Sequence, residues 1–153
     1  MDILLAATPD GGDYVLKGND VESTSELFNQ IYLAFFGGNV EQSTKRDYAI
    51  GEQRKDWWAN ALVFPEDATK QFNSNTERTL RNISLTSAGR IELEESMKLD
   101  LAYIQDLGKT EVSVYLISST QINMQVIITE PTGGQPQEFS VIWDAARNQI
   151  LKS

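Results

Sequence analysis

Two pairs of adjacent carboxylates come nearest to a catalytic arrangement in this sequence, Glu66-Asp67 and Glu94-Glu95. Two carboxyl groups can hydrolyse a glycosidic bond when they lie about 5–9.5 Å apart in a cleft and one of them has a raised pKa. Neighbouring residues on a helix diverge around its axis, so neither pair is expected to converge in this way. Glu94 is instead expected to form an ion pair with Lys98, four residues further along the same helix.

The residue types that are missing narrow the possible chemistry further. The sequence contains no cysteine and no histidine. Thiolate nucleophiles, disulfides and cysteine metal sites are therefore excluded, as are the commonest general base and the commonest transition-metal ligand. Only carboxylates, lysine, tyrosine and hydroxyl groups remain. We expect that the protein is not an enzyme and that it has no catalytic residues, no metal site and no cofactor.

Length and charge indicate one globular domain that binds other proteins. The 153 residues, 41% hydrophobic and 23% charged, suit a single domain over residues 1–153 with one core. A net charge of −9 argues against binding to nucleic acid or to an anionic membrane. No segment approaches the roughly 20 apolar residues of a membrane span, and Asp2 stands where a signal peptide needs positive charge. We expect a cytosolic protein, unless a larger assembly carries it out.

A tryptophan pair, Trp57-Trp58, lies among charged residues between Gly51 and Leu62. Adjacent side chains point in different directions, so the two indoles cannot easily share one core pocket. Arg54 could stack on an indole face, a contact of about 0.5–2 kcal/mol, which would bury the pair within the chain's own loop. Tryptophan is also enriched in interface hot spots, where truncation often costs about 2 kcal/mol or more. Burial by the loop and contact with a partner therefore both stay open.

The tryptophan pair belongs to a long polar segment, residues 39–75. It is polar and irregular apart from the pair itself and Leu62-Val63-Phe64-Pro65. Such a long stretch without periodicity inside a compact domain is usually functional or is ordered by a partner. We therefore predict that residues 39–75 form the partner-binding region.

The first 38 residues predict a hairpin and a helix. The apolar runs 2–7 and 14–17 flank a turn rich in Pro and Gly. Ser23 and Glu26 have the spacing of a capping box, and the helix that follows is expected to end at Gly37-Gly38. Its apolar stripe is Leu27, Phe28, Ile31, Tyr32, Phe35 and Phe36.

Two further helices are predicted in the middle of the chain. Ser74 and Glu77 form a second capping box, which opens a short helix carrying Leu80 and Ile83. A longer helix is expected from about Ser87 to Leu107, with Gly108 as its stop. Its apolar stripe is Leu93, Met97, Leu101, Ile104 and Leu107, widened by Leu99 and Tyr103.

The last third of the chain alternates with a period of two, which is typical of strands. Strands are predicted at 111–118 and 121–129, followed by a third with Phe139, Val141 and Trp143 on its inward face. The predicted fold is α+β: an antiparallel β meander with helices packed on one face, plus an N-terminal hairpin. Trp143 is expected in the core.

The C-terminal stretch 147–152 contains two apolar residues, Ile150 and Leu151, where a chain end would otherwise be expected to fray. It could add as a strand to a neighbouring subunit, or it could dock on the domain's own sheet. We count both residues among the candidates for partner binding.

The order of these elements, together with Arg54 ahead of Trp57-Trp58, resembles the Mu-like phage tail baseplate proteins, structural relatives of the T4-type baseplate wedge and sheath-initiator protein. The resemblance implies a baseplate wedge subunit of a contractile phage tail, or of a related injection machine, which templates the start of sheath polymerisation by strand sharing. It implies partners in the tail sheath protein, other wedge proteins and the tail tube or hub. It also implies several copies in a symmetric virion assembly that is built in the host cytoplasm.

Two alternatives belong to other classes. One is a soluble accessory or binding domain unconnected with tails. The other is a cell-wall hydrolase, which the missing histidine and the divergent carboxylates disfavour.

Overall fold

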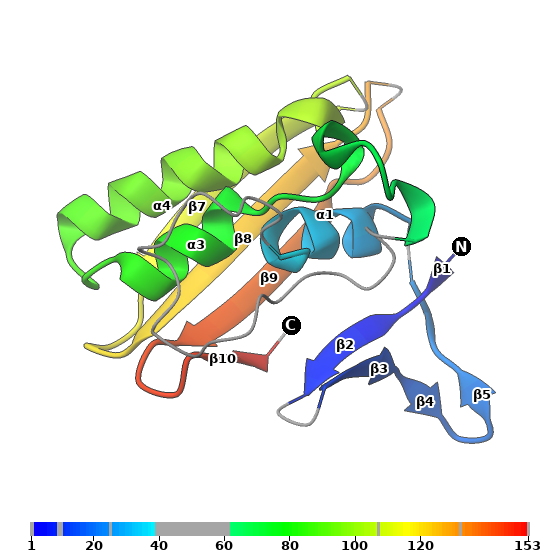
Figure 1. Cartoon of the computed structure of the whole chain (residues 1–153), viewed down its shortest axis with the longest axis horizontal. Helices are drawn as coiled ribbons and strands as arrows, with labels where there is room; N and C mark the ends of the chain where they lie inside the picture. The colour runs from blue at the N-terminus through cyan, green and yellow to red at the C-terminus, as the bar shows by residue number, and fades with distance from the viewer. Residues whose placement is uncertain are drawn as a thin grey trace.

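The computed structural model describes residues 2–8, 11–24, 26–38, 62–106, 108–131 and 133–152. Within these ranges the protein is an α+β fold, as predicted, with one layer of helices against one face of an antiparallel sheet (Figure 1). The hydrophobic core lies between the two layers.

The sheet has four strands in the order β10-β9-β8-β7, and each pairs antiparallel with its neighbour. Their alternation buries one face. On β8, every second side chain from Ile122 to Ile128 is at most 1% exposed. The predicted bounds of this strand are confirmed. The strands are β7 (Lys109–Leu116), β8 (Gln121–Thr129), β9 (Gln137–Asp144) and β10 (Gln149–Lys152).

The helices that cover the sheet are α1 (Glu26–Phe36), α3 (Asn75–Asn82) and α4 (Ser87–Asp100), with two short 3-10 turns, η1 (Ala68–Lys70) and η2 (Ala102–Ile104). Aromatic rings join α1 to β9. Phe28 and Phe35 lie with their ring centroids 4.9 and 5.9 Å from that of Phe139. Phe36 stacks on Trp143 at 6.2 Å, and Trp143 is only 3% exposed, so its predicted place in the core is confirmed.

The long helix is shorter than predicted. It ends at Asp100, and after Leu101 the separate turn η2 carries Ile104 into the core. Leu107 lies outside the described residues. The predicted widening of the apolar stripe is wrong, because Leu99 is 66% and Tyr103 49% exposed. Leu99 follows the buried Met97 by two residues, a rotation of about 200° around the helix axis, which places it on the opposite side from the core.

Residues 2–24 form a unit that we call the N-terminal arm. A hairpin is present as predicted, in the pairing of β2 with β3, but its second strand is Gly11–Tyr14, most of which was assigned to the turn, and the predicted run 14–17 continues into β4. Two more ladders join β1 to β6 and β4 to β5. The strands are β1 (Asp2–Ile3), β2 (Leu5–Thr8), β3 (Gly11–Tyr14), β4 (Leu16–Lys17), β5 (Asp20–Val21) and β6 (Ser23–Thr24).

The three ladders of the arm meet at a closed ring of main-chain hydrogen bonds. Leu4 N donates to Glu22 O at 2.8 Å, Glu22 N to Val15 O at 2.7 Å, and Val15 N to Leu4 O at 3.1 Å. Asn29 on α1 donates from Nδ2 to Ile3 O at 2.6 Å and so ties the arm to the helical layer. Figure 1 shows the arm beside the sheet and helices.

The first predicted capping box, at Ser23 and Glu26, is wrong. Ser23 lies in β6, where it pairs with Ile3, and α1 begins only at Glu26. Ser23 is therefore a strand residue and is not the N-cap. Pairing with β1 takes the place of helix capping for Ser23. β1 lies some twenty residues earlier in the chain, so the sequence near Ser23 gives no sign of this pairing.

Candidate partner-binding surfaces

Three of the predicted binding residues, Arg54, Trp57 and Trp58, lie outside the described residues, as does the whole of 39–61. The structure does describe where this segment leaves and rejoins the domain. Ser74 N donates to Gly38 O at 2.8 Å, and Gly37 N donates to Ser74 Oγ at 3.0 Å. Residues 38 and 74 are therefore held together at the end of α1.

Ser74 is the N-cap residue of α3 by position, but its hydroxyl does not cap that helix. The predicted capping box is wrong in its chemistry. The Ser74 hydroxyl serves the end of α1 instead, and Asp100 at the end of α4 takes its place at α3. Its carboxylate accepts from Asn75 N at 3.0 Å, Asn75 Nδ2 at 2.8 Å and Thr76 N at 2.7 Å. The ends of all three helices thus meet at Ser74, Asn75 and Thr76.

Asp100 is 9% exposed, and burial raises its pKa above the ordinary value even though the N–H groups of Thr76 and Asn75 favour the charged form. Burial likewise raises the pKa of Tyr103 to about 12, with a smaller contribution from the negative charge of Asp100. The hydroxyl of Tyr103 donates to Gln30 O on α1 at 3.2 Å. The Asp100 carboxylate thus links α4 to α3, and the Tyr103 hydroxyl links η2 to α1.

The described end of the predicted partner-binding region, residues 62–74, contains several polar contacts and exposed apolar side chains. Gln71 Nε2 donates to Phe64 O at 2.6 Å. Asp67 accepts from Thr69 and pairs with Lys70 at 3.2 Å, and these two contacts lower its pKa. Leu62 and Val63 are left exposed directly after the tryptophan segment. Leu62 and Val63 therefore form an apolar surface next to the predicted binding residues. The sequence pattern assigned these two residues no separate role within the polar segment.

Three of the four carboxylates considered for catalysis, Asp67, Glu94 and Glu95, make other contacts, and Glu66 is exposed. Glu94 pairs with Arg90, and Lys98 pairs with Glu95 at 2.9 Å, so the predicted Glu94–Lys98 pair is wrong. Glu94 leans toward β7, where its Oε1 also accepts a hydrogen bond from Val114 N at 3.4 Å. This second contact, which comes from a different element, could not be inferred from helical spacing.

Ile150 and Leu151 lie on β10. Ile150 is paired with Trp143 of β9 and packs against the core, whereas Leu151 is exposed and the register shifts between Ile150 and Lys152. The C-terminal stretch thus docks on the domain's own sheet, the second of the two predicted possibilities. Contact with a partner along the outer side of β10 stays a prediction.

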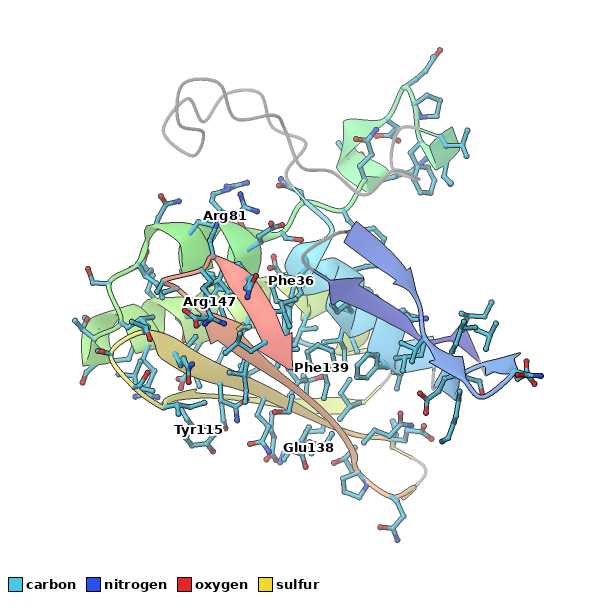
Figure 2. The ribbon with its side chains drawn as sticks, turned by 90° about the horizontal axis from the view of Figure 1, so that it is seen from below. Phe36, Arg81, Tyr115, Glu138, Phe139 and Arg147 are labelled. Carbon is cyan, nitrogen blue, oxygen red and sulfur yellow. The ribbon has the colours of Figure 1, made fainter. Side chains whose placement is uncertain are left out.

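The opposite edge of the sheet, β7, was predicted as a strand but not as a surface. Tyr115, Leu116 and Ile117 are three successive apolar residues that are 53%, 38% and 51% exposed. Figure 2 shows Tyr115 and Glu138 on the side of the sheet that faces away from the helices, with Phe36 and Phe139 between the layers. The sequence did contain a signal for this exposed apolar surface, because no charged residue occurs from Val112 to Thr129.

Within the described ranges, no group of three or more acidic residues is arranged to hold a metal ion. No helix in the same part of the chain is both long and apolar enough to cross a membrane. Comparisons with protein-family models, with curated proteins and with solved structures gave no match.

Proposed function

We propose that this chain is a structural baseplate wedge subunit of a contractile phage tail, or of a related injection machine, and that it templates the start of sheath polymerisation by strand sharing. The observation that carries the proposal is the open sheet: among the strands of the described residues, β7 and β10 each pair with one neighbour only. The main-chain groups on the free side of an edge strand can pair with an extended strand of another chain.

The resemblance to Mu-like baseplate proteins supports the same function. It rests on an opening strand and hairpin, a helix before a glycine stop, the tryptophan segment, a long helix containing Tyr103 and ending at Gly108, and a closing meander. The described residues have the hairpin, the helices and the meander in this order, but the long helix ends at Asp100 and Tyr103 lies in the separate turn η2. The proposed partners are the tail sheath protein, other wedge proteins and the tail tube or hub, with several copies of the chain in the virion baseplate.

Two surfaces are assigned to these partners. Leu151, with the outer side of β10, receives a strand of the sheath protein. Trp57 and Trp58, with Arg54 beside them, contact other wedge proteins.

The test is whether the chain is part of a tail and whether these residues hold it there. Mass spectrometry of purified particles from the source strain should find the chain in the tail fraction. Particles that assemble with Trp57→Ala or Trp58→Ala should lose the chain or fail to form sheath. Leu99→Ala, on the exposed side of α4, is the matched control and should assemble normally.

Complete tails that never contain the chain would overturn the proposal. They would favour the alternative of a soluble accessory domain unconnected with tails.

A further inference from the structure

The strand β9 is longer than the strand that covers its outer side. β9 runs from Gln137 to Asp144, but its pairing with β10 reaches only as far as Ile142, which lies opposite Lys152. Among the described residues no other strand pairs with β9 on that side. Residues 137–141 therefore have a free side, which we call the β9 edge.

The main-chain groups of Glu138 and Ser140 point toward the β9 edge. Ala145 N donates to Thr120 O, directly ahead of β8, at 2.8 Å. Alternate residues of an antiparallel strand direct their N–H and C=O groups to the same side, so the odd-numbered residues of β9 face β8 and the even-numbered residues face away from it. On that outer side, no other described residue makes a main-chain hydrogen bond with Glu138 or Ser140. An extended segment could satisfy these groups.

The edge at β7 is less open than the β9 edge. The outward N–H of Val114, in the middle of β7, already donates to the Glu94 carboxylate of α4 at 3.4 Å. Lys109 and Glu111 place two exposed charges near the start of the same strand. Charged side chains beside an edge restrain its pairing with other chains. The main-chain groups that an added strand needs are therefore available on β9 rather than on β7.

The inner face of the β9 edge is aromatic. Phe139 is 2% exposed, and its ring centroid lies 4.9 Å from that of Phe28 on α1. Phe28 itself is only partly buried. In an added strand, the side chain next to Phe139 points inward, as Phe139 does. An apolar side chain at that position would extend the contact between β9 and α1.

The outer face of the β9 edge carries a negative charge. Figure 2 shows Glu138 on the side of the sheet that faces away from the helices. Its carboxylate accepts a hydrogen bond from Gln125 Nε2 at 2.7 Å, and no lysine or arginine in the described part of the chain pairs with it. Opposite charges on directly opposed residues of neighbouring strands attract each other. The position opposite Glu138 therefore favours a basic residue.

We propose that an extended segment of another protein adds to the β9 edge as a strand, antiparallel to β9 and in line with β10. It carries an apolar residue opposite Phe139 and a basic residue opposite Glu138. Main-chain hydrogen bonds supply the affinity of such strand addition, and alternate side chains supply its specificity. The net charge of −9 likewise favours a basic segment over an acidic one. This site is distinct from the outer side of β10, and the proposal does not rest on a role in phage tails.

The probe is the capped peptide Thr-Val-Lys-Val-Thr, whose first threonine, valine and lysine would lie opposite Ser140, Phe139 and Glu138 in turn. The isotope-labelled full chain is titrated with this peptide while its amide NMR signals are recorded. We expect saturable shifts that are largest at Glu138 and Ser140, and slower hydrogen exchange at these two amides. The same peptide joined to residue 153 by a flexible linker has an effective concentration of about millimolar and should shift the same signals.

Methylated peptides separate strand pairing from non-specific attachment without altering the protein. N-methylation of the peptide's lysine removes the N–H that would donate to Glu138 O. A typical hydrogen bond contributes about 1 kcal/mol, so binding should weaken by roughly fivefold to tenfold. N-methylation of the first valine, whose N–H points away from β9, is the matched control and should leave binding unchanged.

A charge reversal tests the selection by Glu138. Glu138→Lys should weaken binding of the lysine peptide and strengthen binding of Thr-Val-Glu-Val-Thr, each by about threefold or more. Glu111→Lys is the matched control, because Glu111 lies in the same row of the sheet, two strands away across Ile127, and the substitution changes the net charge equally. It should leave the preference between the two peptides unchanged.

Absence of shifts with both the free and the tethered peptide would overturn the proposal. Shifts centred on β7 or on the outer side of β10 would do so as well, because another edge would then receive the strand. Equal losses from the two methylated peptides would mean that the peptide attaches without strand pairing. Equal effects of Glu138→Lys and Glu111→Lys would reject the selection by Glu138. Amides of Glu138 and Ser140 that are already protected from exchange in the free chain would show that the β9 edge is occupied without a partner.

Discussion

The carboxylate of Asp100 is predicted to be the main fastening of α3 to α4. It accepts hydrogen bonds from Asn75 N, Asn75 Nδ2 and Thr76 N, and its residue is 9% exposed. Asp100→Ala leaves the two main-chain N–H groups without this acceptor in a buried place, and each unsatisfied buried donor costs about 1–3 kcal/mol. The substitution also relieves the cost of burying a charge, which offsets part of this loss.

We therefore expect Asp100→Ala to lower the free energy of unfolding by about 2–4 kcal/mol, since the two terms partly cancel. For a chain of this size, that corresponds to a fall in melting temperature of roughly 5–15 °C. Urea denaturation followed by circular dichroism measures the free energy. A loss below about 0.5 kcal/mol, the level of an ordinary surface substitution, would refute the role assigned to Asp100.

The pH dependence gives a second check on the same group. Burial raises the pKa of Asp100 in the folded state above its ordinary value, so the folded chain binds a proton at a higher pH than the unfolded chain does. Acidification through the interval between the two pKa values therefore favours the folded state at this site. The stability of the wild type relative to Asp100→Asn should therefore increase as the pH is lowered from neutral to about 4. A decrease over this range would mean that the hydrogen bonds to the carboxylate outweigh the effect of burial on its pKa.

Three further predictions concern other contacts. Ser74→Ala removes one of the two acceptors of Gly37 N–H, which also donates to Leu33 O at 2.7 Å, and should cost about 0.5–1.5 kcal/mol in urea denaturation, with the exposed Ser87→Ala near zero as its control. Trp143→Phe should cost less than the roughly 3–5 kcal/mol of a large aromatic-to-Ala change, because the buried Nε1 of Trp143 has no hydrogen-bond partner among the described residues; a larger loss in a thermal melt would contradict this. Deletion of residues 149–153 should lower the melting temperature, because Ile150 packs on the core, and an unchanged melt would show that β10 contributes nothing to stability.

The sequence by itself determined the elements whose signal is local. The bounds of β8 and the burial of Trp143 follow from a period of two, and the buried side of α1 follows from the helical period. In each case the pattern lies within the element, so no knowledge of distant neighbours was needed. The α+β architecture followed from the order of these elements.

Only the tertiary structure decided the contacts between elements. The capping spacing at Ser74 was correct as a helix start, but the acceptor came from Asp100, which is distant in sequence. Glu94 could pair with Arg90 or with Lys98 on its own helix. In the folded chain it pairs with Arg90 and also accepts a hydrogen bond from Val114 N of β7. The docking of β10 and the open edge of β7 likewise depend on which strands become neighbours. A main-chain group or a carboxylate forms hydrogen bonds with the groups that the fold brings close to it, and these cannot be identified from the neighbouring residues in the sequence.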